Sequence, residues 1–123
     1  MRKTWNVSVA HAWDFLFTPE GMEIWLGKIM GPLEPGTAYE TSNGVSGKIN
    51  LIKPYSHIRL TWKKKDWNNI SALQIRVIPS KEKTTISFHQ DKLTDGKMRE
   101  EMKFHWDKIL QKIVGIALDL LKR

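Results

Sequence analysis

The last quarter of the chain carries the feature that most constrains its fold. Between Met98 and Leu120, apolar residues recur at steps of three or four positions, which is the spacing of one face of an α-helix. The stripe consists of Met98, Met102, Trp106, Ile109, Ile113, Ile116 and Leu120. No proline interrupts it, so we predict one helix from Thr94 onward, roughly 40 Å long. A helix with a single apolar face needs a second layer to cover that face.

The middle of the chain predicts such a layer, in the form of a β-sheet. Several segments alternate apolar and polar residues, and turn residues or prolines bound them. The predicted strands are residues 37–41, 45–53, 56–62, 71–79 and 83–90. Asn43 and Gly44 form a strong hairpin signal between the first two, and the other connections are short. Strands joined by short turns are antiparallel.

The first 27 residues predict a short strand followed by two short helices. Residues 2–7 alternate as a strand does, and Ser8 can then cap a helix over residues 9–17. Thr18 and Pro19 are a second start signal, for a helix that ends near Gly27. The whole chain, residues 1–123, is therefore predicted to be a single α+β domain. In it a curved antiparallel sheet of about six strands wraps around the long C-terminal helix.

The composition excludes several kinds of site. The chain has no cysteine, which rules out disulfides and thiolate zinc sites and favours a cytoplasmic location. No apolar run is long enough to span a membrane, and the N-terminus lacks the apolar core of a signal peptide. Glycine-rich phosphate loops and nucleophile-elbow motifs are missing, and the histidines lack metal-ligand spacing. We therefore predict no catalytic residues, no metal and no cofactor, and the sequence leaves open whether the protein is an enzyme.

A basic and aromatic stretch, residues 58–77, permits two interpretations. Its sequence "IRLTWKKKDWNNISALQIRV" interleaves Lys63–Lys65 with Trp62 and Trp67, as nucleic-acid grooves do, and the net charge of the chain is +7. The same stretch also reads as two strands joined by a basic loop. Strand alternation turns Trp62 inward and places Trp67 at a loop tip, whereas a stacking surface needs both rings exposed. Nucleic acid is therefore not an expected partner.

Apolar side chains are predicted to meet between the sheet and the long helix. Alternation turns these strand residues inward: Tyr39, Ile49, Leu51, Ile58, Leu60, Trp62, Leu73, Ile75, Val77, Ile86 and Phe88. The facing helix residues are Met98, Met102, Trp106, Ile109 and Ile113. The residues alone leave two interpretations open, a cavity for an apolar small molecule or an ordinary core filled by bulky rings. Arg76 and His89 are predicted to face outward.

A second apolar stripe runs beside the first on the same predicted helix. It consists of Leu110, Val114, Leu118 and Leu121. One sheet-facing stripe does not need both sets of residues. The surplus residues are predicted either to dock near Trp5 and Trp13 or to form a homodimer surface.

Four strings of the sequence resemble a known group, and the match spans residues 3 to about 114. They are "TWNVSVAHAWDFLFTPEGMEIWL", "GVSGKINLIKPYSHIRLTW", and "KTTISFHQDKL" followed by "REEMKFHWDKIL". They resemble the SRPBCC, or START-like, superfamily with its helix-grip (Bet v-type) fold. Within it the chain is similar to proteins related to the C-terminal domain of the activator of heat-shock protein 90 ATPase. No catalytic residue set carries over position by position.

The resemblance implies a pocket between the sheet and the long helix, because members of the superfamily usually enclose one. The candidate ligand-binding residues are Trp25, Tyr39, Leu51, Leu60, Trp62, Ile75, Phe88, Gln90, Met98, Met102, Trp106 and Ile109. A polar anchor is expected among Tyr39, Thr41 and Gln90.

Three functions follow as expectations from this resemblance. The first is binding of an apolar or amphipathic small molecule, lipid-like or polyketide-like, without chemistry. The second is a co-chaperone-like module that docks on a chaperone through the basic second half of the chain, around Lys63–Lys65. The third is an enzyme of cyclase or hydrolase type.

Overall fold

The computed structural model describes residues 2–29 and 33–121, except for the side chains of Trp5 and of residues 117–121, and it confirms the predicted fold. In chain order the elements are β1 (Arg2–Trp5), α1 (Val9–Leu16), α2 (Pro19–Trp25), β2 (Ala38–Glu40), β3 (Val45–Lys53), β4 (His57–Lys64), β5 (Ser71–Ser80), β6 (Lys83–Asp91) and α3 (Gly96–Leu121). The predicted caps are also present. Ser8 Oγ accepts the amide of His11 at the start of α1, and Thr18 Oγ1 accepts that of Gly21 at the start of α2, both at 3.0 Å.

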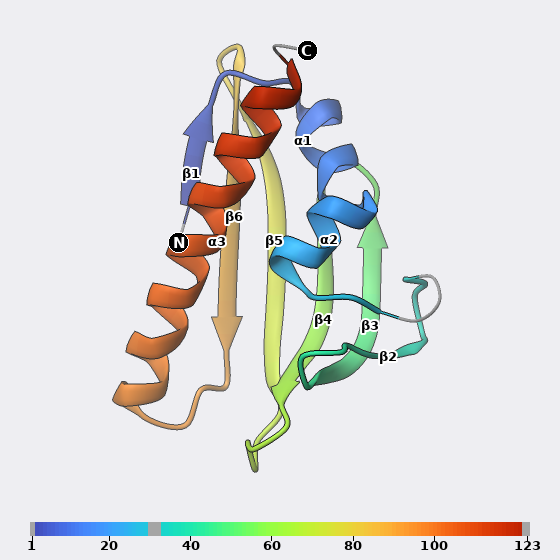
Figure 1. The fold of residues 1–123 in the computed structure, drawn as a ribbon, viewed down its shortest axis with the longest axis vertical. Helices are drawn as coiled ribbons and strands as arrows, with labels where there is room; N and C mark the ends of the chain where they lie inside the picture. Colours follow the sequence, from blue (N-terminus) through green and yellow to red (C-terminus); the bar gives the residue numbers. More distant parts are fainter. Residues whose placement is uncertain (1, 30–32, 122–123) are drawn as a thin grey trace.

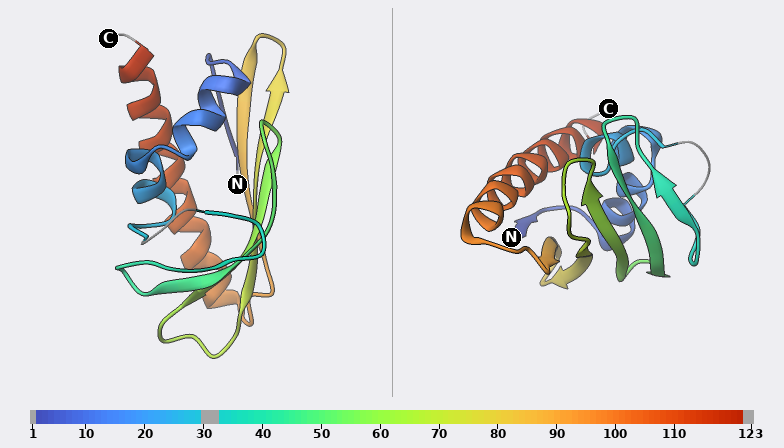
Figure 2. Two further views of the ribbon diagram at one scale, coloured as in Figure 1. Left: turned by 90° about the vertical axis from the view of Figure 1, so that its right-hand side faces the viewer. Right: turned by 90° about the horizontal axis from the view of Figure 1, so that it is seen from below.

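The strands form one antiparallel sheet in the order β1-β6-β5-β4-β3-β2. Figure 1 shows α3 running obliquely along the side of the sheet that ends in β1, with α1 and α2 beside it. In the side view of Figure 2, α1, α2 and α3 lie on one face of the curved sheet, and none of the described helices covers the other face. None of the described helices is both long and apolar enough to cross a membrane.

The centre of the space between sheet and helix is filled by side chains. The Trp106 ring has no exposed surface, and its centroid lies 5.0 Å from that of Phe88 and 5.6 Å from that of Trp62. The indole N–H of Trp106 donates to Gln90 Oε1 at 2.8 Å, and Gln90 Nε2 donates to Ser71 Oγ at 2.8 Å. The indole N–H of Trp106 and the side-chain amide of Gln90, which would otherwise lie unpaired among the packed rings, are thus hydrogen-bonded inside the core.

The prediction that Leu51 faces inward is wrong. The pairing of β3 with β4 shifts between Ile49, which lies opposite Leu60, and Leu51, which lies opposite Arg59. Asn50 is the extra residue of a β-bulge, and such an insertion moves the residues that follow to the other face of the sheet. Leu51 is consequently 39% exposed on the outer face. Arg76 and His89 are exposed on the outer face, as predicted.

The prediction that Trp67 stands exposed at a loop tip is also wrong. Strand β4 continues through Lys63 and Lys64, and the amide of Trp67 then donates to Lys64 O at 3.0 Å, which closes a tight turn. The turn folds Trp67 back onto Trp62, with ring centroids 5.3 Å apart, and leaves Trp67 only 8% exposed. Neither ring is available as a stacking surface for bases.

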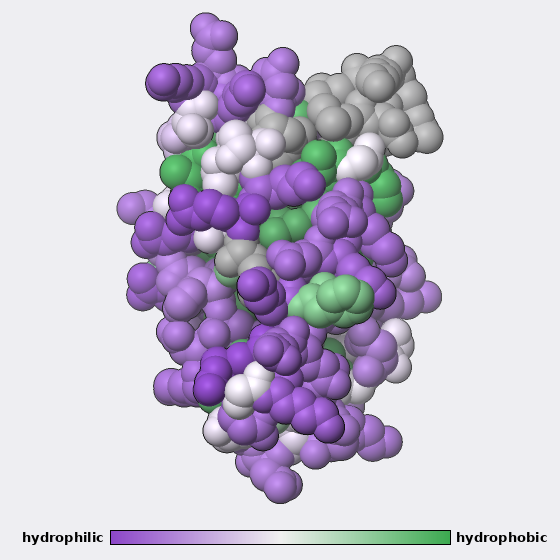
Figure 3. Space-filling model, turned by 90° about the vertical axis from the view of Figure 1, so that its left-hand side faces the viewer, coloured by the Kyte–Doolittle hydropathy of each residue, from purple (hydrophilic) through white to green (hydrophobic). Residues whose placement is uncertain are grey.

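The second stripe of α3 is partly used within the chain. Leu110 is 2% exposed and belongs to the core, and Val114 packs against that core. The side chains of Leu118 and Leu121 lie outside the described residues, so the homodimer expectation is untested at those positions. Figure 3 views the molecule from the side of β1 and α3, where hydrophilic residues dominate the visible surface.

Candidate functional site

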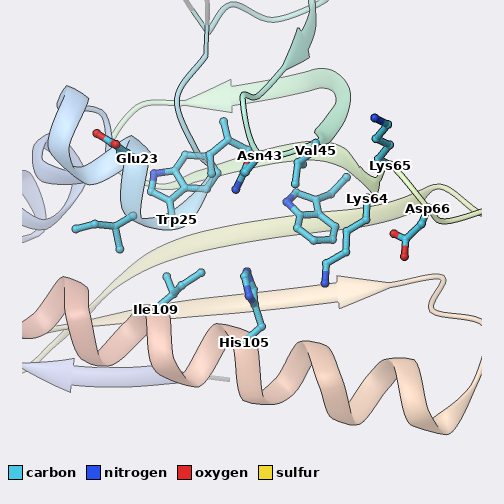
Figure 4. Close-up of a pocket in the computed structure, with 13 residues that line it drawn as sticks. Glu23, Trp25, Asn43, Val45, Lys64, Lys65, Asp66, His105 and Ile109 are labelled. Carbon is cyan, nitrogen blue, oxygen red and sulfur yellow. The ribbon is translucent and has the colours of Figure 1, made fainter.

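A pocket of about 380 Å³ opens at one end of the fold, where α2, the turn after β2, the end of β4 and α3 meet (Figure 4). Its apolar lining residues are Ile24, Trp25, Leu26, Val45, Trp62 and Ile109. Its polar lining residues are Glu23, Asn43, Lys64, Lys65, Asp66 and His105, and Gly44 completes the wall. We call this the mouth pocket, because it is the part of the space between sheet and helix that the core rings leave open.

Two local features build the wall of the mouth pocket. Trp25 ends α2, and its indole N–H donates to Leu16 O at 2.7 Å, which fixes the ring. Gly27 then turns the chain with φ of +123°, a conformation that favours glycine. A Cβ at position 27 would stand 2.6 Å from Asn43 Oδ1, so the glycine also lets the turn after β2 approach α2.

One residue that lines the mouth pocket, Trp62, carries an unpaired polar atom. Trp62 is 2% exposed, and its Nε1 has no hydrogen-bond partner among the described residues. The equally buried indoles of Trp25 and Trp106 both donate at normal distances. A buried donor left unsatisfied costs about 1–3 kcal/mol. Trp62 is also one of the residues that line the mouth pocket.

The rim of the mouth pocket carries charges of both signs. In Figure 4, Lys64 extends toward the helix that carries His105, whereas Lys65 points away from the pocket and Glu23 lies at the opposite end. The Lys64 amine lies 6.0 Å from the centroid of the Trp67 ring. Within the described ranges, no ion pair joins Lys64 to Glu23 or Asp66. The amine is therefore free to meet the charge of a ligand.

His105 is held neutral at the boundary between core and pocket. Its ring packs 4.6 Å from Trp106 and 6.1 Å from Trp62. Burial, and secondarily the positive charge of Lys64, lower the pKa of His105 below 6.5. Among the described residues, no hydrogen bond joins His105 to Glu23 or Asp66, so the rim holds no carboxylate–histidine pair of the kind that general-base catalysis uses.

We predict that an NMR titration of the His105 ring protons gives a midpoint below 6.5, and that Lys64→Gln raises it by removing a positive charge. Because the folded pKa lies below the unfolded value, the unfolded chain binds the proton more readily. The free energy of unfolding should therefore fall as pH drops from about 6.5 toward the folded pKa, and be fully retained above that window. A midpoint at or above 6.5 would contradict the packing described for His105.

Three of the candidate ligand-binding residues line the mouth pocket: Trp25, Trp62 and Ile109. Others lie in the filled core, namely Leu60, Ile75, Phe88, Met102 and Trp106. Met98 is half-buried at the start of α3, and Gln90 is committed to Trp106 and Ser71. Asn43, Val45, Lys64 and His105 also line the pocket but were not predicted from the sequence. Asn43 was recognised only as a turn signal, and nothing local indicates that this turn packs beside α2.

Tyr39 does not lie in the mouth pocket, and its hydroxyl is already engaged. The residue pairs with Gly47 on β3 and reaches across that strand to donate to Thr61 O on β4 at 2.5 Å. Burial raises the pKa of Tyr39. Thr41 is likewise buried and bonded to Val45. Both expected anchors therefore tie strands together.

The curved antiparallel sheet and the long C-terminal helix across it define a helix-grip fold. The sequence profile described as "Activator of Hsp90 ATPase homolog 1-like protein" matches residues 6–117. The chain belongs to that family. Comparison with curated proteins found no match.

Solved structures share this fold at low sequence identity. DynU16, from the dynemicin biosynthetic locus, superposes with a TM-score of 0.82 at 14% identity, over 92% of this chain and 44% of its own. CalU16 from Micromonospora echinospora superposes with a TM-score of 0.82 at 18% identity, over 98% of this chain and 76% of its own. PFC0360w, an HSP90 activator from Plasmodium falciparum, superposes with a TM-score of 0.79 at 16% identity, over 97% of this chain and 94% of its own. This chain therefore spans less than half the length of DynU16.

Proposed function

We propose that this chain binds an amphipathic small molecule in the mouth pocket. The observation that carries the proposal is an open pocket whose lining includes Trp62, a residue with a buried, unpaired indole N–H. The pocket volume falls near the lower end of the range of about 300–1,000 Å³ that small-molecule sites occupy. Such sites combine an apolar lining with a few polar groups that fix orientation.

The lining favours a ligand with one apolar end and one polar end. Trp25, Trp62 and Ile109 offer an apolar surface on the inner side, where the core closes the pocket. Lys64 stands nearer the rim, where a polar or negatively charged group of the ligand would remain partly hydrated, and His105 lies at the boundary between core and pocket. The expected lipid-like or polyketide-like ligand is consistent with this division, provided that it is small. One protein of this fold, DynU16, comes from a biosynthetic locus, which supports a small-molecule role.

The test is ligand binding followed at the Trp62 indole N–H. A library of fatty acids and aromatic carboxylic acids is titrated into nitrogen-15-labelled protein, and a binder should shift the Trp62 indole resonance. Ile24→Trp, which fills the mouth pocket from α2, should weaken that binding at least about tenfold, a loss of about 1.4 kcal/mol.

The matched control is Ile70→Trp, because Ile70 is 58% exposed and does not line the mouth pocket. Equal weakening by both substitutions would show that binding occurs elsewhere. A library that shifts no pocket resonance in a protein with normal melting behaviour would remove the proposal.

A second candidate function is a co-chaperone-like interaction, supported by the family to which the chain belongs and by the HSP90 activator among the similar structures. Lys65 is the exposed member of the basic run, whereas Lys63 and Lys64 are half-buried in β4. Pull-down with the heat-shock protein 90 homologue of the host tests this candidate. We expect Lys65→Glu to weaken capture, and unchanged capture would exclude this surface.

A further inference from the structure

The outer face of the sheet carries a row of basic residues that crosses five strands. Cross-strand pairing aligns Lys53 on β3, His57 on β4, Arg76 on β5, Ser87 on β6 and Arg2 on β1. Neighbouring strands lie about 4.8 Å apart, so this basic row extends roughly 19 Å. Lys53, Arg76 and Arg2 are exposed, and no helix covers this face in Figure 2.

The basic row contains a hollow that is shaped for an anionic group. Ser87 lies between Arg76 and Arg2 in the pairing, and its short side chain leaves a gap between the two long ones. A concavity of about 260 Å³ is lined there by Arg2, Arg76, Ser87, Gln74 and His89. Every one of these side chains can donate a hydrogen bond, and none is a carboxylate. Two guanidinium groups flanking a hydroxyl suit a carboxylate, which arginine binds with two parallel hydrogen bonds.

The positive charge of this face is not neutralised within the described part of the chain. One ion pair is found there, between His89 Nε2 and Asp91 at 2.9 Å, and none involves Arg2, Arg59 or Arg76. The three cations Arg76, Arg59 and Lys53 all lower the pKa of His57, in addition to the larger effect of burial. In the pairing, His57 separates Lys53 from Arg76 and Ser87 separates Arg76 from Arg2, so these cations do not lie directly opposite one another.

The exposed face of α3 is also basic, but acidic residues are interspersed among its basic residues. It carries Lys97, Arg99, Lys103, Lys108 and Lys112, but Glu100, Glu101 and Asp107 are interspersed among them. Opposite charges on neighbouring turns of a helix offset one another. The basic row differs from the exposed face of α3 because none of its own residues is acidic, and Asp91, a carboxylate on the same face, is paired with His89.

We infer that the outer face of the sheet binds an extended acidic segment of a partner protein, with one carboxylate seated between Arg2 and Arg76. The length of the basic row fits several residues of an extended chain. A single-stranded nucleic acid would need aromatic side chains for its bases to stack on, and the row contains none. A membrane surface would need apolar side chains that insert, and the row contains none of these either. This inference does not depend on a ligand in the mouth pocket.

Fluorescence anisotropy of a labelled decapeptide of alternating glutamate and serine tests the inference. The double substitution Arg2→Gln and Arg76→Gln should weaken binding of this peptide about tenfold, because it removes both arms of the carboxylate clamp. The control double substitution, Lys103→Gln and Lys112→Gln, removes the same charge from α3 and should weaken binding less than about twofold. Melting temperatures of both variants establish that they fold.

Two further measurements complete the test. Peptide titration of the wild-type protein should shift amide resonances around Ser87 and Arg76 and leave those of α3 unchanged. The peptide in which glutamine replaces glutamate should not bind. Equal weakening by the two double variants would overturn the inference, because binding would then follow net charge alone. A labelled oligothymidylate that binds more tightly than the acidic peptide and depends on Arg2 and Arg76 would overturn it as well.

Discussion

Trp106→Ala is expected to lower the free energy of unfolding by about 3–5 kcal/mol. The Trp106 side chain is fully buried between the rings of Phe88 and Trp62, so its removal leaves a void that its neighbours refill only in part. Gln90 Oε1 also loses its donor inside the core. Because the total stability of a domain is about 5–15 kcal/mol, urea denaturation of this variant should show a large loss.

The matched control for this prediction is Phe104→Ala. Phe104 lies on the same helix but is 62% exposed, and the Lys108 amine lies 4.4 Å from the centroid of its ring. Its truncation should change the free energy of unfolding by about 0.5 kcal/mol or less. If Trp106→Ala cost as little as Phe104→Ala, the space between sheet and helix would be an open cavity rather than a packed core.

Gly47→Ala is expected to destabilise the protein on the order of 3 kcal/mol. A Cβ at position 47 would stand 2.0 Å from Thr61 O, and a backbone oxygen in the middle of the sheet cannot move aside. The same oxygen accepts the Tyr39 hydroxyl, so the substitution would also disturb the link between β2 and β4. Thermal and urea denaturation measure the loss.

The control is the same substitution at another glycine. Gly115 lies in α3, and a methyl group added to it would enter open space, with no atom of another element within 4 Å. Gly115→Ala should therefore stabilise the protein by about 0.5–1 kcal/mol. Opposite signs for the two changes would verify the close approach at Gly47. A loss below about 0.5 kcal/mol for Gly47→Ala would contradict it.

Much of the fold was predictable because its signals are local. The bounds of β3 coincide with the predicted residues 45–53, and both short helices begin after their predicted caps. The apolar stripe of α3 identified Met102, Trp106, Ile109 and Ile113 as buried, since a helix of this length can bury only one face.

The candidate site was much less predictable, because it depends on contacts between distant parts of the chain. The bulge at Asn50 moved Leu51 to the outer face, and no residue in that strand predicts a bulge at this position. The turn after Lys64 buried Trp67 through a ring contact that strand alternation does not encode. Whether the space between the layers is empty or filled depended on the volumes of Trp62, Phe88 and Trp106 together, and these come from three different elements.

The pairing of β1 with β6 has a consequence for how the chain folds. Strands β3 to β6 pair with their neighbours in sequence across short turns, whereas Arg2 pairs with Ser87 near the other end of the chain. Closing the longer loop costs more chain entropy, so β1 should join the sheet after the β3–β6 meander has formed. Until then, the outer edge of β6 stays unpaired, and another unfinished molecule can add a strand to it. Refolding at high protein concentration should therefore favour intermolecular pairing along β6, and occupation of that edge by β1 ends the exposure.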